Sequence, residues 1–176
     1  MTHFEAMAAI FACAPDEEAR LADLLRRVEP DPDLRAGAEC LERDGWDLVV
    51  VSAGSSWYID RILDAAGVRA TVHANPGRIQ EGRGLVLGLP RDSPFFCPEV
   101  GIDKAAVVED ALRRYGRVAF AGDGPPDVKP ALLVDPSLRF ARGYLAGELA
   151  ARGEAFLPYG RWFEIVEHLT GGCGKR

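Results

Sequence analysis

Short apolar runs that alternate with helix-type stretches constrain the fold of this chain more than any other sequence feature. Residues 47–52 (DLVVVS) form a continuous valine-rich run, which is typical of a strand buried on both faces of a sheet. Residues 56–66 then carry apolar side chains at helical spacing, and a second apolar run follows at 117–121 (RVAFA). Strands that alternate with helices predict an α/β fold, with a parallel sheet and helices on both of its faces.

The same patterns place the remaining elements. Residues 1–45 show helical spacing and no apolar strand, so helices are expected there. Residues 75–100 are rich in glycine and proline and predict a hairpin around 81–84, followed by a loop. Helices are also expected over 103–115 and near 161–169. The strands are expected near 48–52, 69–73, 117–121, 131–134 and 138–140.

The composition and charge exclude several classes of protein. Hydrophobic residues make up 48% and charged residues 27% of the 176 residues, which is ordinary for a soluble globular protein. The formal net charge of −6 disfavours nucleic acid as a partner, and no apolar run approaches the roughly 20 residues of a membrane span. The first residues lack a basic segment of the secretory type. We therefore expect a cytoplasmic protein with no nucleic-acid or membrane partner.

Polar residues that follow the predicted strands are the candidates for chemistry. Ser52 follows the first strand, and Asp123 and Asp127 follow the run at 117–121, while Lys104 lies in the first turn of a predicted helix. Ligands of open α/β sheets bind at the carboxyl ends of the strands. A hydroxyl and backbone amides hold a phosphate, a lysine neutralises it, and two carboxylates bind Mg²⁺. The sequence thus predicts a site for phosphate and Mg²⁺.

Each of these residues also has a simpler interpretation. Ser52 alone is a common turn residue, Lys104 alone a common solvated helix residue, and GDGPPD (122–127) a possible surface turn. The AGDG stretch also matches a weak methyltransferase-type glycine loop, which needs an acidic residue at the end of the next strand. Asp135 stands at such a place, but Ser52 and Lys104 then have no role. The order of serine, lysine and GDxxxD favours the phosphate site.

Three motifs together resemble those of the haloacid-dehalogenase-like (HAD) phosphatases, in the phosphoserine-phosphatase-like branch. They are VVVSAGSS (49–56), GIDKAAVV (101–108) and VAFAGDGPPD (118–127). Within that branch the stretches FFCPEVGIDK, LRFARGYL and FLPYGRWFEIVEHL are similar to the 2-hydroxy-3-keto-5-methylthiopentenyl-1-phosphate phosphatases of methionine salvage. The resemblance spans roughly residues 5–169 and implies an enzyme that hydrolyses a small phosphorylated metabolite.

The resemblance also implies a role for each matching residue. Ser52 binds the transferring phosphoryl group, helped by the amides of Ala53 and Gly54, although the branch usually has glycine where this chain has Ala53. Lys104 bridges the phosphate and the nucleophile. By the same resemblance, the cofactor is Mg²⁺ with Asp123 as its ligand.

The remaining implications concern the second carboxylate and the domains. Asp127 supports the metal directly or through water. Residues 1–45 form a small helical cap, and residues 46–170 form a HAD-like core. Within that core residues 75–100 are a flap of hairpin and loop, and residues 171–176 are a flexible tail.

One departure from the family pattern is large. HAD phosphatases carry an aspartate nucleophile in a DxDxT/V motif after the first, central strand, and neither this strand nor this motif occurs here. The DxD at Asp31–Asp33 lies between helix-type stretches and predicts a turn. Without the nucleophile no aspartyl-phosphate forms, so we expect the chain as given to be inactive.

The absence of the motif has three explanations. The chain is a truncated or misassigned form of an active phosphatase, a natural inactive relative, or a protein that receives the strand from another chain. The alternative function is a non-catalytic HAD-like module that binds phosphate or a partner. The missing strand also predicts unpaired strand edges, with self-association as a possible result, while the oligomeric state stays open.

Overall fold

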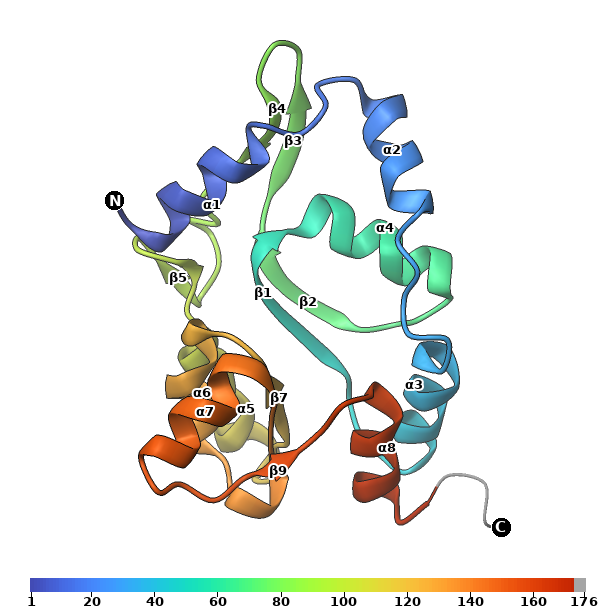
Figure 1. The fold of residues 1–176 in the computed structure, drawn as a ribbon, viewed down its shortest axis with the longest axis vertical. Helices are drawn as coiled ribbons and strands as arrows, with labels where there is room; N and C mark the ends of the chain where they lie inside the picture. The colour runs from blue at the N-terminus through green and yellow to red at the C-terminus, as the bar shows by residue number, and fades with distance from the viewer. Residues whose placement is uncertain (173–176) are drawn as a thin grey trace. The chain divides into compact units, whose positions relative to one another are not determined.

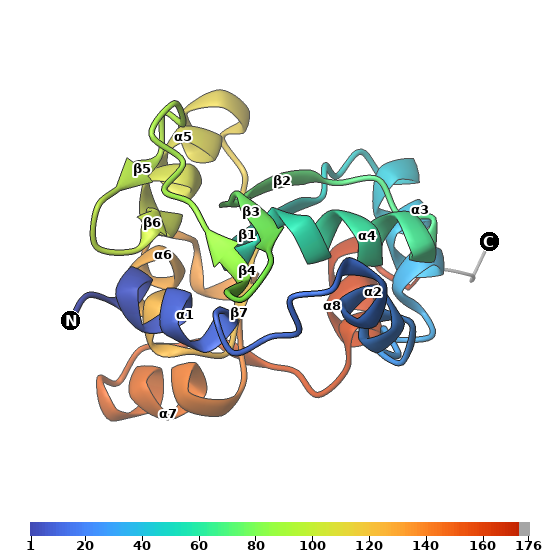
Figure 2. The same cartoon turned by 90° about the horizontal axis from the view of Figure 1, so that it is seen from above.

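The computed structural model describes residues 1–172, and the chain divides into two compact units, Met1–Asp103 and Lys104–Arg176. Figures 1 and 2 show the ribbon from two directions. The boundary between the units falls inside the segment 46–170, so the division into cap, core and tail stays a prediction. The predicted tail lies outside the described residues from 173 onward. Within 1–172, no helix combines the length and apolar character that crossing a bilayer requires.

The first unit begins with three helices, as the spacing in residues 1–45 predicts. They are α1 (His3–Phe11), α2 (Glu18–Arg26) and α3 (Leu34–Arg43). Thr2 starts α1 in a capping box: its hydroxyl accepts from the Glu5 amide, and the Glu5 carboxylate accepts from the Thr2 amide. Asp16, which precedes α2, accepts from the Gly82 amide at 2.7 Å and ties this segment to the hairpin.

A parallel pair of strands follows in the first unit. β1 (Val49–Ser55) leads into α4 (Ser56–Ala66), and α4 leads back to β2 (Thr71–Asn75), which pairs with β1 in parallel (Figure 1). The helix ends at Gly67, whose φ of 65° is a left-handed conformation that suits glycine. These elements confirm the strand–helix–strand order that the sequence predicts.

Two hairpins complete the first unit. β3 (Gly77–Gln80) and β4 (Gly84–Leu87) pair antiparallel around the turn that the sequence predicts, and β5 (Phe96–Cys97) and β6 (Gly101–Ile102) form a second, shorter pair. Their apolar side chains supply part of the buried core. The most buried of these are Leu85, Leu87 and Ile102.

The second unit holds a three-stranded parallel sheet in the order β7-β8-β9. Buried apolar side chains from α6, β8 and α7 form its core: Ala131, Ala141, Leu145 and Leu149. The elements, in chain order, are α5 (Lys104–Tyr115), β7 (Phe120–Gly122), η1 (Pro125–Asp127), α6 (Val128–Leu133), η2 (Pro136–Leu138), β8 (Arg139–Ala141), α7 (Gly143–Ala151), β9 (Leu157–Pro158) and α8 (Trp162–Thr170).

The strand predicted at 131–134 is wrong, because residues 128–133 form helix α6. The two prolines of η1 fix helical φ angles just before it, and α6 continues the same right-handed winding. A short apolar run such as ALLV does not by itself distinguish a strand from a buried helical turn. The strand at 138–140 is confirmed as β8, whereas α7 and β9 have no counterpart in the predictions.

The expectation that the first strand is buried on both faces is also wrong. Val49 is 40% exposed, and Val50 and Val51 are only partly buried. In the described part of the chain β1 pairs only with β2, and β7 pairs only with β8. Each strand therefore has one hydrogen-bonded neighbour, and its other backbone edge is unpaired.

Candidate functional site

Lys104 and Asp127 form a short ion pair in the second unit. Lys104 is the first residue of α5, and Asp127 ends η1 just after β7. The Lys104 Nζ lies 2.7 Å from Asp127 Oδ1, with 19% of the lysine side chain and 5% of the aspartate side chain exposed. The pair places a partly accessible ammonium group beside the end of a parallel strand, which is where ligands of such sheets bind.

The second oxygen of Asp127 is held by the backbone. Asp127 Oδ2 accepts hydrogen bonds from the amides of Asp123 and Gly124, both at 2.9 Å. Burial by itself would raise the pKa of Asp127, but the hydrogen bond and charge of Lys104, together with the two amides, outweigh it and lower the pKa. Asp127 is therefore a buried carboxylate that stays ionised and shapes the loop at 122–124.

Asp123 is the more accessible carboxylate of this loop. Its side chain is 61% exposed, and its Oδ2 lies 3.7 Å from Nη2 of Arg142, which follows β8. The Arg142 guanidinium also lies over the ring of Tyr159, which follows β9, at 5.2 Å from the centroid. Burial raises the pKa of Tyr159, whose hydroxyl donates to the Gly122 carbonyl at 3.4 Å. Polar groups thus gather at the carboxyl ends of all three strands.

The donor set fits a Mg²⁺ ion in part. Asp123 offers one exposed carboxylate, and Mg²⁺ in proteins is often bound through one or two carboxylates while it keeps several waters. Both oxygens of Asp127 already accept hydrogen bonds, which favours support through water over direct ligation. Within residues 1–172, no group of three or more His, Cys, Asp or Glu residues is placed to hold a metal.

Ser52 lies in an irregular part of β1 in the first unit. Val51 faces His73 and Ser55 faces Asn75, so four steps along β1 span two steps along β2. This bulge takes the place of the turn that the sequence predicts after the strand. Within it the Gly54 amide donates to Ser52 Oγ at 3.0 Å.

The neighbours of Ser52 explain why position 54 is a glycine. A Cβ atom there would overlap the hydroxyl of Tyr58 and lie 3.2 Å from Ser52 Oγ. The carbonyl of Ala53 accepts from the Asn75 side-chain amide at 2.8 Å. The bulge is therefore held by two hydrogen bonds, one from the Gly54 amide to Ser52 Oγ and one from Asn75 to the Ala53 carbonyl.

The structure brings together three of the predicted site residues: Lys104, Asp123 and Asp127. Ser52, Ala53 and Gly54 lie together in the other unit. Their convergence with the lysine and the two aspartates stays a prediction, as do the phosphate-binding and metal-binding roles.

The structure also shows the roles of two other aspartates, Asp31 of the DxD stretch and Asp135 of the methyltransferase interpretation. Asp31 Oδ1 accepts from the Asp33 amide at 2.9 Å in a turn, as the sequence predicts. Asp135 caps η2 by accepting from the amide and hydroxyl of Ser137. Because 131–134 is a helix, Asp135 does not end a strand, and the methyltransferase interpretation loses its acidic residue.

The residues that the sequence did not single out are Asn75, Arg142 and Tyr159. Asn75 is the last residue of β2, so the rule that found Ser52 also applies to it. Arg142 and Tyr159 follow β8 and β9, which are only three and two residues long. Strands this short leave little pattern in the sequence.

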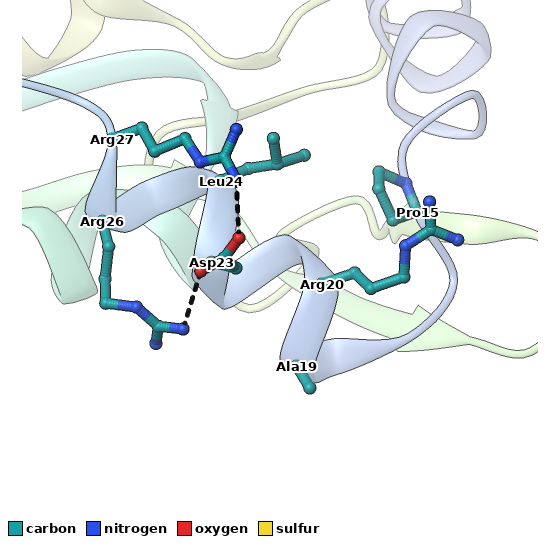
Figure 3. A pocket seen from close by; sticks show the side chains of 7 residues that line it. All are labelled: Pro15, Ala19, Arg20, Asp23, Leu24, Arg26 and Arg27. Carbon is teal, nitrogen blue, oxygen red and sulfur yellow. Dashed lines mark hydrogen bonds and ion pairs between the residues drawn. The ribbon is translucent and has the colours of Figure 1, made fainter.

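A hollow on the surface beside α2 is a separate feature (Figure 3). Pro15, Ala19, Arg20, Asp23, Leu24, Arg26 and Arg27 line it. Asp23 is bound by Arg26 at 3.0 Å and by Arg27 at 3.1 Å, as the dashed lines show. It contains none of the predicted site residues, and its one carboxylate is already paired with two exposed arginines.

Comparison with known proteins decides the family. Residues 2–131 match the model of the haloacid dehalogenase-like hydrolases. The chain belongs to this family. A relative, the pyridoxal phosphate phosphatase PHOSPHO2 of Rattus norvegicus, is 25% identical over 191 residues, covering 94% of this chain and 79% of the relative.

Two solved structures share the fold. A probable phosphoserine phosphatase from Vibrio cholerae superposes with a TM-score of 0.62 at 19% identity, covering 87% of this chain and 46% of that one. A phosphoserine phosphatase from T. onnurineus gives a TM-score of 0.59 at 18% identity, with 97% and 72% covered. The chain therefore spans less than half the length of the V. cholerae structure.

These findings confirm the predicted HAD-like α/β fold and the predicted relationship to HAD phosphatases. They confirm the expectation of a hydrolase at the level of the family. The particular likeness to the methionine-salvage phosphatases stays a prediction.

Proposed function

We propose that this chain belongs to a Mg²⁺-dependent phosphomonoester hydrolase that acts on a small phosphorylated metabolite. We also propose that the 176 residues alone do not complete the reaction, because the sequence carries no DxDxT/V motif after a strand. The proposed substrate class rests on the names of the relatives: they are named for pyridoxal phosphate and phosphoserine, both small phosphomonoesters. By its composition the protein is proposed to be cytoplasmic.

The observation that carries this proposal is the Lys104–Asp127 pair beside Asp123. Asp127 holds the lysine ammonium in one place, so that Lys104 is positioned to neutralise a phosphate. Asp123 supplies an exposed carboxylate for Mg²⁺, which would offset the charge of the transferring phosphoryl group. Ser52 adds a hydroxyl for a phosphate oxygen.

What the proposed set lacks is a nucleophile. Ser52 Oγ accepts from the Gly54 amide, and no histidine or carboxylate contact that would activate the serine is found within residues 1–172. The lysine is charged and paired, so it has no free electron pair with which to attack phosphorus. The family's aspartate nucleophile is therefore proposed to come from outside the 176 residues.

The test compares turnover with binding. The purified chain, with Mg²⁺, is given p-nitrophenyl phosphate, pyridoxal phosphate and phosphoserine, and binding of inorganic phosphate is measured in parallel. The proposal expects negligible hydrolysis but phosphate binding that Lys104→Met weakens. Robust Mg²⁺-dependent hydrolysis would show that the chain contains a nucleophile after all, and absence of phosphate binding would remove the site.

A second candidate function is a non-catalytic module that binds phosphate or a partner. The missing DxDxT/V motif favours this module. It is also favoured because both Asp127 oxygens already accept hydrogen bonds, from Lys104 and from the loop amides, which leaves Asp127 less able to bind a metal directly. A longer protein that contains this chain distinguishes the two: the enzyme gains turnover that Asp123→Asn cripples, whereas the module binds phosphate and does not turn over.

A further inference from the structure

We propose that Asn75 is a positioning residue for Ser52: it fixes the peptide that holds the Ser52 hydroxyl, and so prepares that hydroxyl to donate to a phosphate oxygen. The inference rests on the proposed function, in which Ser52 binds the phosphoryl group. Every atom it uses lies in the first unit, where β1 and β2 run side by side (Figure 1).

The first link joins Asn75 to the backbone of the bulge. Asn75 is fully buried, and its Nδ2 donates to the carbonyl of Ala53 at 2.8 Å. The regular pairing of β1 with β2 is interrupted between Val51 and Ser55, so Ala53 lies outside the register of paired residues. The asparagine side chain supplies a hydrogen bond to this carbonyl within the interrupted stretch.

The second link joins the same peptide to Ser52. A trans peptide is planar, so its carbonyl and its N–H point in opposite directions. With the Ala53 carbonyl held by Asn75, the Gly54 N–H points the other way, and it donates to Ser52 Oγ at 3.0 Å. Hydrogen bonds in such a series polarise one another.

The third link concerns the hydroxyl hydrogen of Ser52. A serine hydroxyl has one donor and two acceptor positions, and the Gly54 amide uses one acceptor position. The donor is thereby directed away from Gly54 and toward an acceptor such as a phosphate oxygen. Asn75 thus sets the direction of the Ser52 donor without touching the ligand.

The surroundings of Asn75 argue against a purely space-filling role. Its Oδ1 is buried with no hydrogen-bond partner among the described residues, which costs free energy that an apolar side chain would avoid. Gly101, at a φ of +83°, packs so closely that a Cβ there would overlap this Oδ1. The glycine therefore leaves the room that the Asn75 side chain occupies while its Nδ2 donates to the Ala53 carbonyl.

The experiment uses the ¹⁵N-labelled 176-residue chain and two readouts. Without ligand, hydrogen exchange of the Gly54 amide is measured in the wild type, in Asn75→Ala and in Leu85→Ala, which removes an equally buried apolar side chain of the same unit. We expect exchange at Gly54 to become about tenfold faster in Asn75→Ala than in Leu85→Ala, relative to the amides of β2. If Asn75→Ala does not fold, Asn75→Ser replaces it, because it keeps a polar group but no longer reaches Ala53.

The second readout is titration with inorganic phosphate. We expect Asn75→Ala and Ser52→Ala each to weaken binding about tenfold, and the double variant to bind no more weakly than Ser52→Ala, since Asn75 acts through Ser52. Equal Gly54 exchange in Asn75→Ala and Leu85→Ala would overturn the inference, and so would additive losses in the double variant. If Ser52→Ala left phosphate binding unchanged, the proposed role of Ser52 would fail, while the Gly54 exchange would still decide whether Asn75 holds the bulge.

Discussion

Gly122 leaves the space that the Asp127 carboxyl occupies: a Cβ atom built on Gly122 would lie 2.6 Å from the Cβ of Asp127 and 2.8 Å from its Oδ2. These distances are shorter than real side chains tolerate. The glycine is therefore a steric requirement of the ion pair with Lys104, and not only a turn residue. The first residue of the GDG stretch is therefore a glycine because any larger side chain there would overlap Asp127.

Replacing Gly122 with alanine tests this requirement. Gly122→Ala is expected to destabilise the protein by about 1–3 kcal/mol, because the added methyl displaces the Asp127 carboxylate from its amide donors. The matched control is Gly147→Ala in α7, where a Cβ meets nothing within 4 Å and helix propensity favours alanine by about 0.5–1 kcal/mol. Urea unfolding measures both variants, and equal effects would refute the steric role of Gly122.

The buried ion pair predicts a large effect for the neutral variant Asp127→Asn. Removing one partner of a buried pair leaves the other charge uncompensated and costs about 3 kcal/mol, near the low end of the usual range because Lys104 is partly exposed. Asp110→Asn is the control, since its arginine partners on α5 are mostly exposed and such pairs contribute less than about 1 kcal/mol. A loss no larger than that of Asp110→Asn would show that the pair is effectively solvated.

The lowered pKa of Asp127 predicts a loss of stability in acid. The pKa in the folded state lies below the value of about 3.9 for an unfolded aspartate, so the ionised form stabilises the fold above that value. This contribution is lost as the pH falls below about 4 and through the folded pKa. In that range the unfolded state binds a proton on Asp127 more readily than the folded state does, so acid favours unfolding. Urea unfolding from pH 3 to 7 measures it. Asp127→Asn is expected to show a shallower acid dependence than the wild type, and parallel curves would contradict this assignment.

The unpaired edges of β1 and β7 predict fast exchange and self-association. Each strand has one hydrogen-bonded neighbour in the described part of the chain, and Val49 and Ala121 are exposed. Unpaired edges with apolar side chains favour pairing with another strand. In a verified monomer, about half of the amides at 49–51 and 120–122 should exchange quickly. Strong protection of both segments in such a monomer would refute the open edges.

The sequence predicted the parts of the site that depend on local pattern. The rule that ligands bind at the carboxyl ends of parallel strands singled out Asp123 and Asp127, and the structure places Lys104 against Asp127 at 2.7 Å. That contact joins residues 23 positions apart, and it required only that a helix begins and a strand ends where the pattern indicates. The hairpin near 81–84 was predicted for a similar reason, since glycine marks its turn.

The rest depends on tertiary contacts that leave no local pattern. The apolar pattern of residues 131–134 fits a strand and a helical turn equally well. In the structure α6 directly continues the helical turn η1, which begins at Pro125. Arg139 is 4% exposed and binds the carbonyls of Ala131, Val134 and Ala155. A single arginine in a sequence is expected on the surface, so its buried role is visible only in the fold. Asn75 is a different case: it ends β2 and so meets the rule that singled out Ser52, but the strand was predicted to stop at residue 73.

The measurement that tests the central claim most directly is phosphate binding at Lys104. Calorimetric titration of the 176-residue chain with inorganic phosphate, with and without Mg²⁺, compares the wild type with Lys104→Met and Asp123→Asn, each checked for folding by circular dichroism. The account predicts that Mg²⁺ tightens binding to the wild type, that Lys104→Met weakens it about tenfold or more, and that Asp123→Asn abolishes the Mg²⁺ effect. Equal phosphate affinity in the wild type and Lys104→Met would contradict it.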